Sequence, residues 1–248
     1  MKEDLIFPLL SEFAPKYQEE LLVKNLQNAL KAFTTNNLKD LRQCIQKEPL
    51  RFLGFVLGGG FARAGAERAG YGEIAYKVLE KITGNFSLSI KLEPEEVWQE
   101  FKNHCIREEK GVNEKLNRGV VEGLIRLNND VGNIYQWIKE TIESAGDIDE
   151  LFIRLCGIRR VGPKISALIL RDLVWLGDLE DKIQAHHFYL QPIDVWIRRI
   201  AVYHWDELSE VQDFVIAVRI SEACQKLKLS GVRFNQGSLY FATQTKGP

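Results

Sequence analysis

The chain has 248 residues, of which 45% are hydrophobic and 27% charged, and its 33 basic and 34 acidic residues give a net charge of −1. This size allows one or two domains with a substantial buried core, and the near-neutral charge excludes a globally basic nucleic-acid-binding protein, so any surface that binds a polyanion has to be local. No apolar run approaches the roughly 18 residues of a membrane-spanning helix, and the first ten residues do not resemble a signal peptide, so we expect a cytoplasmic protein without membrane association.

Helical periodicity extends along the chain. Apolar side chains recur every three or four residues, which places them on one face of a helix, and no segment shows the sustained alternation of a strand. Pro94 and Pro163 suit the first turn of a helix, and Asp147 suits a capping position. We therefore expect an all-α protein with helices over residues 18–33, 38–45, 64–82, 94–105, 120–127, 134–144, 149–156, 163–175, 194–205, 211–227 and 234–243.

Two connections interrupt this pattern. An apolar run over residues 50–57 stops at Gly58-Gly59-Gly60, which lacks the Gly-Lys-Ser/Thr ending of a phosphate loop and the dinucleotide-binding fingerprint. We expect a helix break or close packing there. Residues 177–192 form a longer, polar connection. We interpret the whole as two helical lobes that are interleaved along the sequence.

The four cysteines, Cys44, Cys105, Cys156 and Cys224, lie far apart in the sequence. Their spacing matches no zinc or iron–sulfur ligand set. We expect reduced thiols, mostly buried, as in a cytosolic protein.

The most informative pattern is a predicted helical hairpin. Gly162 permits a tight backbone between two helices, and Pro163 fits the first turn of the second, whose exposed amides and dipole form an anion site. A phosphate is the natural ligand, although an ordinary connection between two helices with solvated arginines is the alternative. Residues 151–171 contain no acid, and their basic residues are Arg154, Arg159, Arg160, Lys164 and Arg171.

The segment Leu155-x-x-Ile158-x-x-Val161-Gly162-Pro163-Lys164-x-x-Ala167 resembles the helix-hairpin-helix motif. Followed by Pro192-Ile193-Asp194-Val195, it is similar to the helix-hairpin-helix/GPD superfamily of DNA glycosylases. The resemblance covers residues 147–205. It implies one glycosylase unit over residues 1–248, with the hairpin at about 148–175 and an aspartate loop and helix at about 192–205.

Three features depart from the usual family pattern. Arg160 replaces the first glycine of the Gly-Val-Gly hairpin. The spacing between Lys164 and Asp194 is long, so residues 177–191 resemble an insertion, as in the archaeal 8-oxoguanine branch. The cysteine cluster of the endonuclease III and adenine-glycosylase branches is absent, so we expect no iron–sulfur cluster and no required cofactor.

The resemblance implies catalytic roles for Lys164 and Asp194. The lysine would attack the sugar C1′ of an extruded nucleotide and form a Schiff base, for which the amine must be neutral. Burial, the neighbouring arginines and the helix N-terminus would favour that form. Asp194 would cap a helix and stabilise positive charge at C1′. The alternatives are a lysine that only contacts phosphate and an aspartate that only caps.

Further ligands follow from the same resemblance. The hairpin carbonyls of Cys156, Ile158 and Val161 would hold a monovalent cation, Na⁺ or K⁺. The predicted phosphate-binding residues are Arg159, Arg160, Gly162, Lys164 and Arg198.

Gln236 and Tyr240 lie one helical turn apart and are candidates for the base pocket. The alternative is that they belong to a terminal packing helix. Trp175 and Trp196 are expected in the core.

The resulting hypothesis is a monomeric, prokaryotic, bifunctional DNA glycosylase and lyase. Its partner would be double-stranded DNA with an oxidised base such as 8-oxoguanine. A monofunctional glycosylase and a non-enzymatic DNA-binding protein are the alternatives.

Overall fold

The computed structural model describes residues 3–30, 38–62, 70–84 and 91–244. These residues are helical apart from turns and short connections, and none of them forms a strand. The prediction of an all-α protein is confirmed. No helix in these ranges combines the length and apolar composition needed to span a bilayer.

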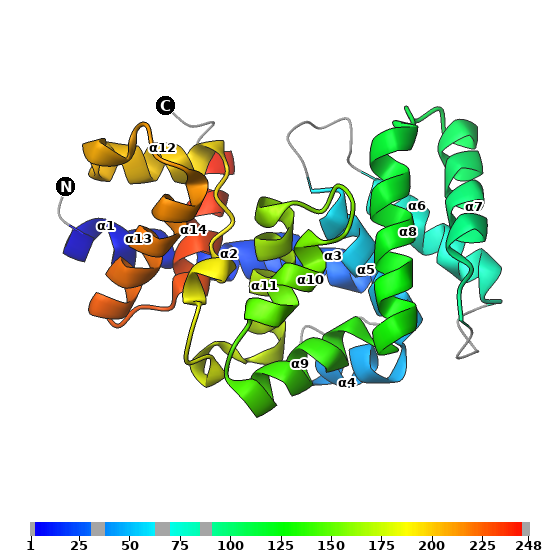
Figure 1. Ribbon diagram of the computed structural model, residues 1–248, viewed down its shortest axis with the longest axis horizontal. Coiled ribbons are helices and arrows are strands. Elements are labelled where there is room, and N and C mark those ends of the chain that lie inside the picture. Colours follow the sequence, from blue (N-terminus) through cyan, green and yellow to red (C-terminus); the bar gives the residue numbers. More distant parts are fainter. Residues whose placement is uncertain (1–2, 31–37, 63–69, 85–90, 245–248) are drawn as a thin grey trace.

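The chain begins and ends in the same lobe, at the left of Figure 1. Phe7 and Leu10 from the first helix pack against Ile197, Ile216 and Phe234 from the last three helices. The rings of Phe7 and Phe234 stack with their centroids 4.1 Å apart. The helices of this lobe are α1 (Glu3–Ser11), α12 (Val195–His204), α13 (Asp213–Lys226) and α14 (Gly231–Gln244), with the short 3₁₀ turn η5 (Asp206–Leu208).

A larger core lies in the middle of the sequence. It includes the fully buried side chains of Trp98, Phe101, Val121 and Leu170. The helices of this lobe are α3 (Lys24–Leu30), α4 (Leu38–Lys47), α5 (Pro49–Gly60), α6 (Tyr71–Ile82), α7 (Pro94–Arg107), α8 (Glu114–Val131), α9 (Ile134–Ala145), α10 (Asp149–Cys156) and α11 (Pro163–Gly177).

Two segments join the lobes. The first is α2 (Ala14–Tyr17) with the π-helical turn η1 (Gln18–Val23), and the second holds the 3₁₀ turns η3 (Glu180–Lys182) and η4 (His187–Leu190). Helix α11 contacts α5 and α9 in the larger lobe and α14 in the other. It therefore packs against elements of both lobes.

Several helix boundaries differ from the predictions. Helix α5 includes Gly58 and Gly59 and ends at Gly60, with Phe61 as its C-cap, so the expected helix break lies at the last glycine of the triplet. The close packing that was the alternative is also present. A Cβ at Gly60 would lie 2.7 Å from Val120 Cγ1. The predicted helix over residues 18–33 contains a π-helical turn before α3. Residues 31–33 and 64–69, which belong to two predicted helices, lie outside the described residues.

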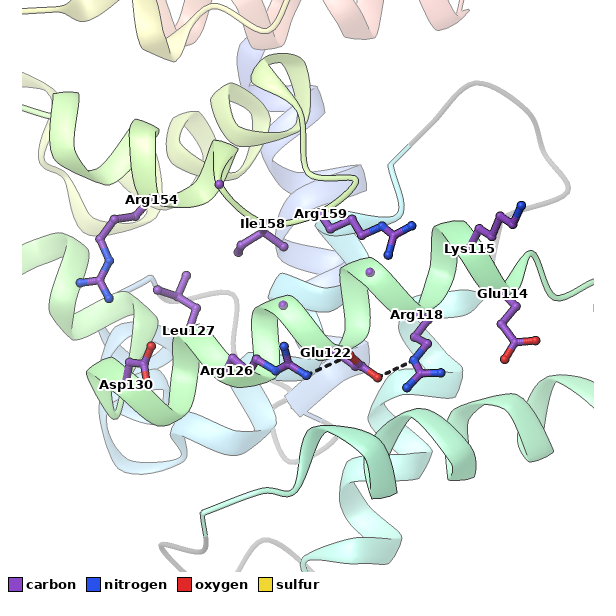
Figure 2. A pocket seen from close by; sticks show the side chains of 13 residues that line it. Glu114, Lys115, Arg118, Glu122, Arg126, Leu127, Asp130, Arg154, Ile158 and Arg159 are labelled. Carbon is purple, nitrogen blue, oxygen red and sulfur yellow. Dashed lines mark hydrogen bonds and ion pairs between the residues drawn. The ribbon is translucent and has the colours of Figure 1, made fainter.

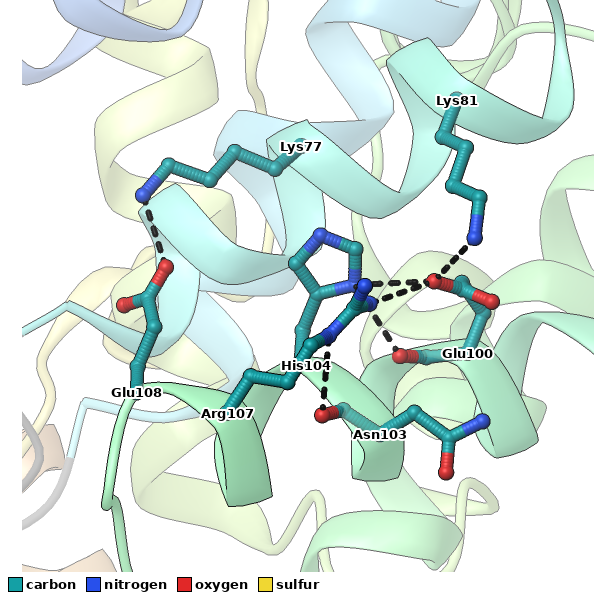
Figure 3. A network of polar contacts seen from close by, with 7 residues as sticks. All are labelled: Lys77, Lys81, Glu100, Asn103, His104, Arg107 and Glu108. Atoms are coloured by element: carbon teal, nitrogen blue, oxygen red, sulfur yellow. Dashed lines mark hydrogen bonds and ion pairs between the residues drawn. The ribbon is translucent and has the colours of Figure 1, made fainter.

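Ion pairs between charged side chains connect α6 and α7 at the surface (Figure 3). Glu100 Oε1 accepts hydrogen bonds from Lys81 Nζ at 2.7 Å and from Arg107 Nη2 at 2.8 Å. Lys77 Nζ donates to Glu108 Oε1 at 2.8 Å. Burial raises the pKa of Glu100, but these cations outweigh it and hold the pKa below its ordinary value. The network therefore adds to the hydrophobic contact between the two helices near neutral pH.

A substitution at Gly237 tests how closely α14 packs against the N-terminal helices. A Cβ there would lie 1.9 Å from the carbonyl oxygen of Leu10 and 3.0 Å from the backbone nitrogen of Ala14. Because both atoms belong to the backbone, they cannot rotate away. We expect Gly237→Ala to lower the free energy of unfolding by about 1–3 kcal/mol, despite the gain in helix propensity. Denaturant titration measures the change. Gly111→Ala, where nothing lies within 4 Å, is the control, and equal stability of the two variants would contradict the close approach.

Candidate functional site

Helix α10, a short turn and helix α11 follow one another along the chain, as in a helical hairpin. Leu155 and Val161 are fully buried and anchor the two sides of the turn. Within it, the Ile158 N–H donates to the Leu155 carbonyl at 3.1 Å and the Val161 N–H to the Ile158 carbonyl at 2.9 Å. Before α10, Asp147 Oδ1 accepts from the backbone N–H of Ile148 at 2.6 Å. This geometry is compatible with the helix-hairpin-helix motif, and the assignment to that motif stays a prediction.

The strained residue of the turn is Arg160. Its φ is 74°, in the left-handed region that favours glycine. Gly162 has φ −83° and ψ −179°, an extended conformation open to any residue, and nothing lies within 4 Å of an added Cβ. The expectation that Gly162 supplies the tight backbone is therefore wrong. The left-handed residue lies at the position where the resemblance to the helix-hairpin-helix motif predicts the first glycine.

The start of α11 presents unsatisfied amides. Within the described part of the chain, no acceptor receives the backbone N–H of Gly162 or of Lys164. The first amides of a helix lack intrahelical partners and carry the positive end of the dipole. These two donors are therefore available to an anion at this terminus.

Lys164 lies on the first turn of α11 and is exposed, as are Arg159 and Arg160. We expected burial to favour the neutral amine of Lys164. The expected burial is wrong, because the side chain of Lys164 is exposed in the protein alone. A bound ligand would have to desolvate it.

Asp194 is the N-cap of α12. Its Oδ1 accepts from the backbone N–H of Trp196 at 2.9 Å and of Ile197 at 2.8 Å. The side chain is half-buried, and within the described residues no hydrogen-bond donor reaches Oδ2. One carboxylate oxygen thus fixes the helix, and the other is left for a ligand.

Arg198, another predicted phosphate ligand, already has hydrogen-bond partners within the protein. Arg198 Nη2 donates to Asp213 Oδ1 at 2.7 Å and to the Val211 carbonyl at 2.8 Å. These contacts tie α12 to α13. Its role towards phosphate stays a prediction, and binding a phosphate would compete with them.

The predicted cation ligands are backbone oxygens of the turn. The Ile158 carbonyl already accepts the Val161 N–H, which leaves its second lone pair. The described residues contain no cluster of three or more His, Cys, Asp or Glu side chains suited to a metal. A cation at the turn would therefore depend on carbonyl groups, and this ligand set stays a prediction.

Gln236 and Tyr240 face the N-terminal segment. Gln236 is fully buried, donates to Asp172 Oδ1 at 3.2 Å, and accepts from Gln18 Nε2 at 2.8 Å. The Tyr240 hydroxyl donates to Glu20 Oε2 at 2.6 Å, and this bond raises the pKa of Tyr240. Both side chains thus line the junction between α14 and residues 17–20, and their role towards a base stays a prediction.

Next to them lies a buried cluster that the sequence did not reveal. Arg171 is fully buried, donates from Nη1 to Asn235 Oδ1 at 2.6 Å and from Nε to Asp172 Oδ1 at 2.9 Å. Its guanidinium carbon lies 4.8 Å from the ring centroid of Tyr17, whose hydroxyl also accepts from Nη2. Burial raises the pKa of Tyr17 well above its ordinary value.

Arg171 therefore does not belong to the basic surface on which the sequence placed it. The available signal was its position beside Asp172 within the apolar run of α11, because an adjacent ion pair in a buried helix implies a buried polar network. Burial lowers the pKa of Arg171, but Asp172 beside it and, to a smaller extent, the charge of Asp194 outweigh burial and hold the pKa above its ordinary value.

Comparisons of the chain with protein-family models, curated proteins and solved structures found no match.

The backbone at Arg160 provides a test of the turn. Glycine avoids the cost of a left-handed residue, about 1–2 kcal/mol, so Arg160→Gly should be tolerated. The matched variant Arg159→Gly removes a neighbouring exposed arginine whose φ is not positive. We expect Arg160→Gly to be the more stable of the two by about 1 kcal/mol, measured by chemical denaturation. The opposite order would contradict the left-handed turn.

Proposed function

We propose that this protein is a DNA glycosylase with lyase activity, which removes an oxidised base, 8-oxoguanine first among the candidates, from double-stranded DNA. One observation carries the proposal. A solvent-exposed lysine and two backbone N–H groups without an acceptor lie at the start of α11, and Asp194, the N-cap of α12, has one carboxylate oxygen without a hydrogen-bond donor among the described residues. The reaction needs a site that binds the DNA phosphate, a nucleophile, and an anionic group that stabilises positive charge on the sugar.

The hairpin would bind first. The N–H groups of Gly162 and Lys164 would donate hydrogen bonds to a phosphate of the DNA backbone, with Arg159 adding positive charge on the same turn. A duplex base is out of reach within the stack, so the target nucleotide has to be extruded. Contact with the DNA would remove water from Lys164 and so favour its neutral amine.

The chemical step would follow at C1′ of the extruded sugar. The Lys164 nitrogen forms a bond to C1′ while the glycosidic bond breaks, and the base leaves with its electron pair and takes up a proton. Asp194 Oδ2 would stabilise the positive charge that develops on the sugar. Opening of the sugar ring gives the Schiff base, and loss of a C2′ proton with departure of the 3′ phosphate cuts the strand.

One observation favours a second candidate. Because Lys164 is exposed and sits at an anion-binding terminus, it would also serve as a phosphate contact in a monofunctional glycosylase, with water as the nucleophile. The two candidates differ in whether a covalent intermediate forms at Lys164.

Borohydride trapping separates these candidates. On duplexes that each carry one oxidised base, we expect the wild-type protein to form a covalent adduct, because borohydride reduces the Schiff base. Lys164→Ala should form none, whereas the exposed control Lys226→Ala should match wild type. Base release without an adduct in wild type, retained by Lys164→Ala, would favour the monofunctional candidate.

Substitutions at Asp194 separate the role of its carboxylate in the reaction from its role as a helix cap. Asparagine caps a helix about as well as aspartate, so Asp194→Asn should keep the melting temperature while the single-turnover rate of base release falls about 10²–10⁴-fold. Asp194→Ala should lose the cap as well, at about 1 kcal/mol of stability. An unchanged rate in Asp194→Asn would restrict Asp194 to capping.

A further inference from the structure

A charged groove of about 780 Å³ runs between α8 and the end of α10 with its turn (Figure 2). Among the described residues that line it, five are basic and three acidic, whereas the whole chain has a net charge of −1. The groove is thus a local positive surface on a near-neutral protein. Its basic residues are Lys115, Arg118 and Arg126 on α8 and Arg154 and Arg159 on the opposite wall.

The two walls of the groove meet at glycines. A Cβ at Gly119 would lie 2.8 Å from the Arg159 carbonyl oxygen, and one at Gly123 would lie 2.2 Å from Ile158 Cγ2. The hairpin turn therefore rests directly on α8. This contact fixes Arg159 relative to α8 and makes the groove continuous with the anion-binding turn.

The groove contains both neutralised and uncompensated cations. Glu122 accepts from Arg118 Nε at 2.6 Å and from Arg126 Nη2 at 3.1 Å. Lys115 and Arg159 are exposed and have no carboxylate partner within the described part of the chain. Figure 2 shows Arg159 extending towards the end of α8 that carries Lys115. Arg154, which lies near Asp130 at the opposite end of the groove in Figure 2, is also exposed, and its guanidinium carbon lies 5.0 Å from the ring centroid of Trp137. Cations without a carboxylate partner among the described residues therefore lie at both ends of the groove.

We propose that this groove is a second binding site for the sugar–phosphate backbone of DNA, occupied by phosphates next to those held by the hairpin amides. The inference rests on the proposed function and extends it. Arg159 belongs to both surfaces, so a strand that binds the turn passes directly to the groove. Binding there is to phosphate and not to bases, and is therefore independent of sequence and lesion.

The salt dependence of binding tests the groove. Loss of one phosphate contact reduces the slope of log Kobs against log[salt] by about 0.9 for duplex DNA. We expect this change for Lys115→Ala, with equal weakening for duplexes with and without a lesion, and a larger loss for Lys115→Glu. The control Lys226→Ala removes a lysine whose side chain is 76% exposed on α13 and should keep the wild-type slope.

The possible results distinguish the groove from the proposed function. If wild type binds duplex DNA and the Lys115 variants keep its slope, the groove proposal is overturned and the proposed function stands. If wild type does not bind duplex DNA, both fail. Binding of an acidic phosphopeptide or of anionic vesicles in place of DNA, lost in Lys115→Glu, would assign the groove to another partner and overturn the proposal.

Discussion

The fold depends on a positive charge buried between two lobes. Arg171 has no exposed surface, and a buried guanidinium is tolerated only when its donors and its charge are satisfied. The partners are Asp172 beside it on α11, Tyr17 from α2 and Asn235 from α14. Because these come from the beginning, the middle and the end of the chain, the cluster requires both lobes to meet in one arrangement.

That arrangement positions the candidate site. Lys164 and Arg171 are seven residues apart and therefore share a face of α11, separated by about 10 Å of helix rise. At one end of this face Lys164 is exposed, and further along it Arg171 is buried in the cluster. Asn235 of that cluster donates from Nδ2 to the Pro192 carbonyl at 3.5 Å, two residues before Asp194. The cluster thus connects α11 with the segment that leads to the cap of α12.

The contact with α8 holds the other side of the turn. Gly119 and Gly123 allow the backbone at Ile158 and Arg159 to approach the helix directly. Because the turn packs directly on α8, its contacts with that helix can compensate for the strain of the left-handed conformation at Arg160.

The sequence was sufficient for elements that depend on local rules. The apolar period specified most of the helices, and Pro163 marked the start of α11. Asp194 was expected to cap α12 and does so. The sequence was not sufficient where tertiary contacts decide. The glycine triplet remains helical because α5 packs closely on its neighbours, and Arg171 is internal because residues far away in the sequence supply its partners.

The central claim is that Lys164 is the nucleophile. The most direct measurement is mass-spectrometric peptide mapping of the wild-type protein after borohydride reduction on a duplex with 8-oxoguanine. The account predicts a single modified peptide with the reduced sugar fragment on Lys164. A sugar fragment on another lysine or on the terminal amine, with Lys164 unmodified, would contradict it.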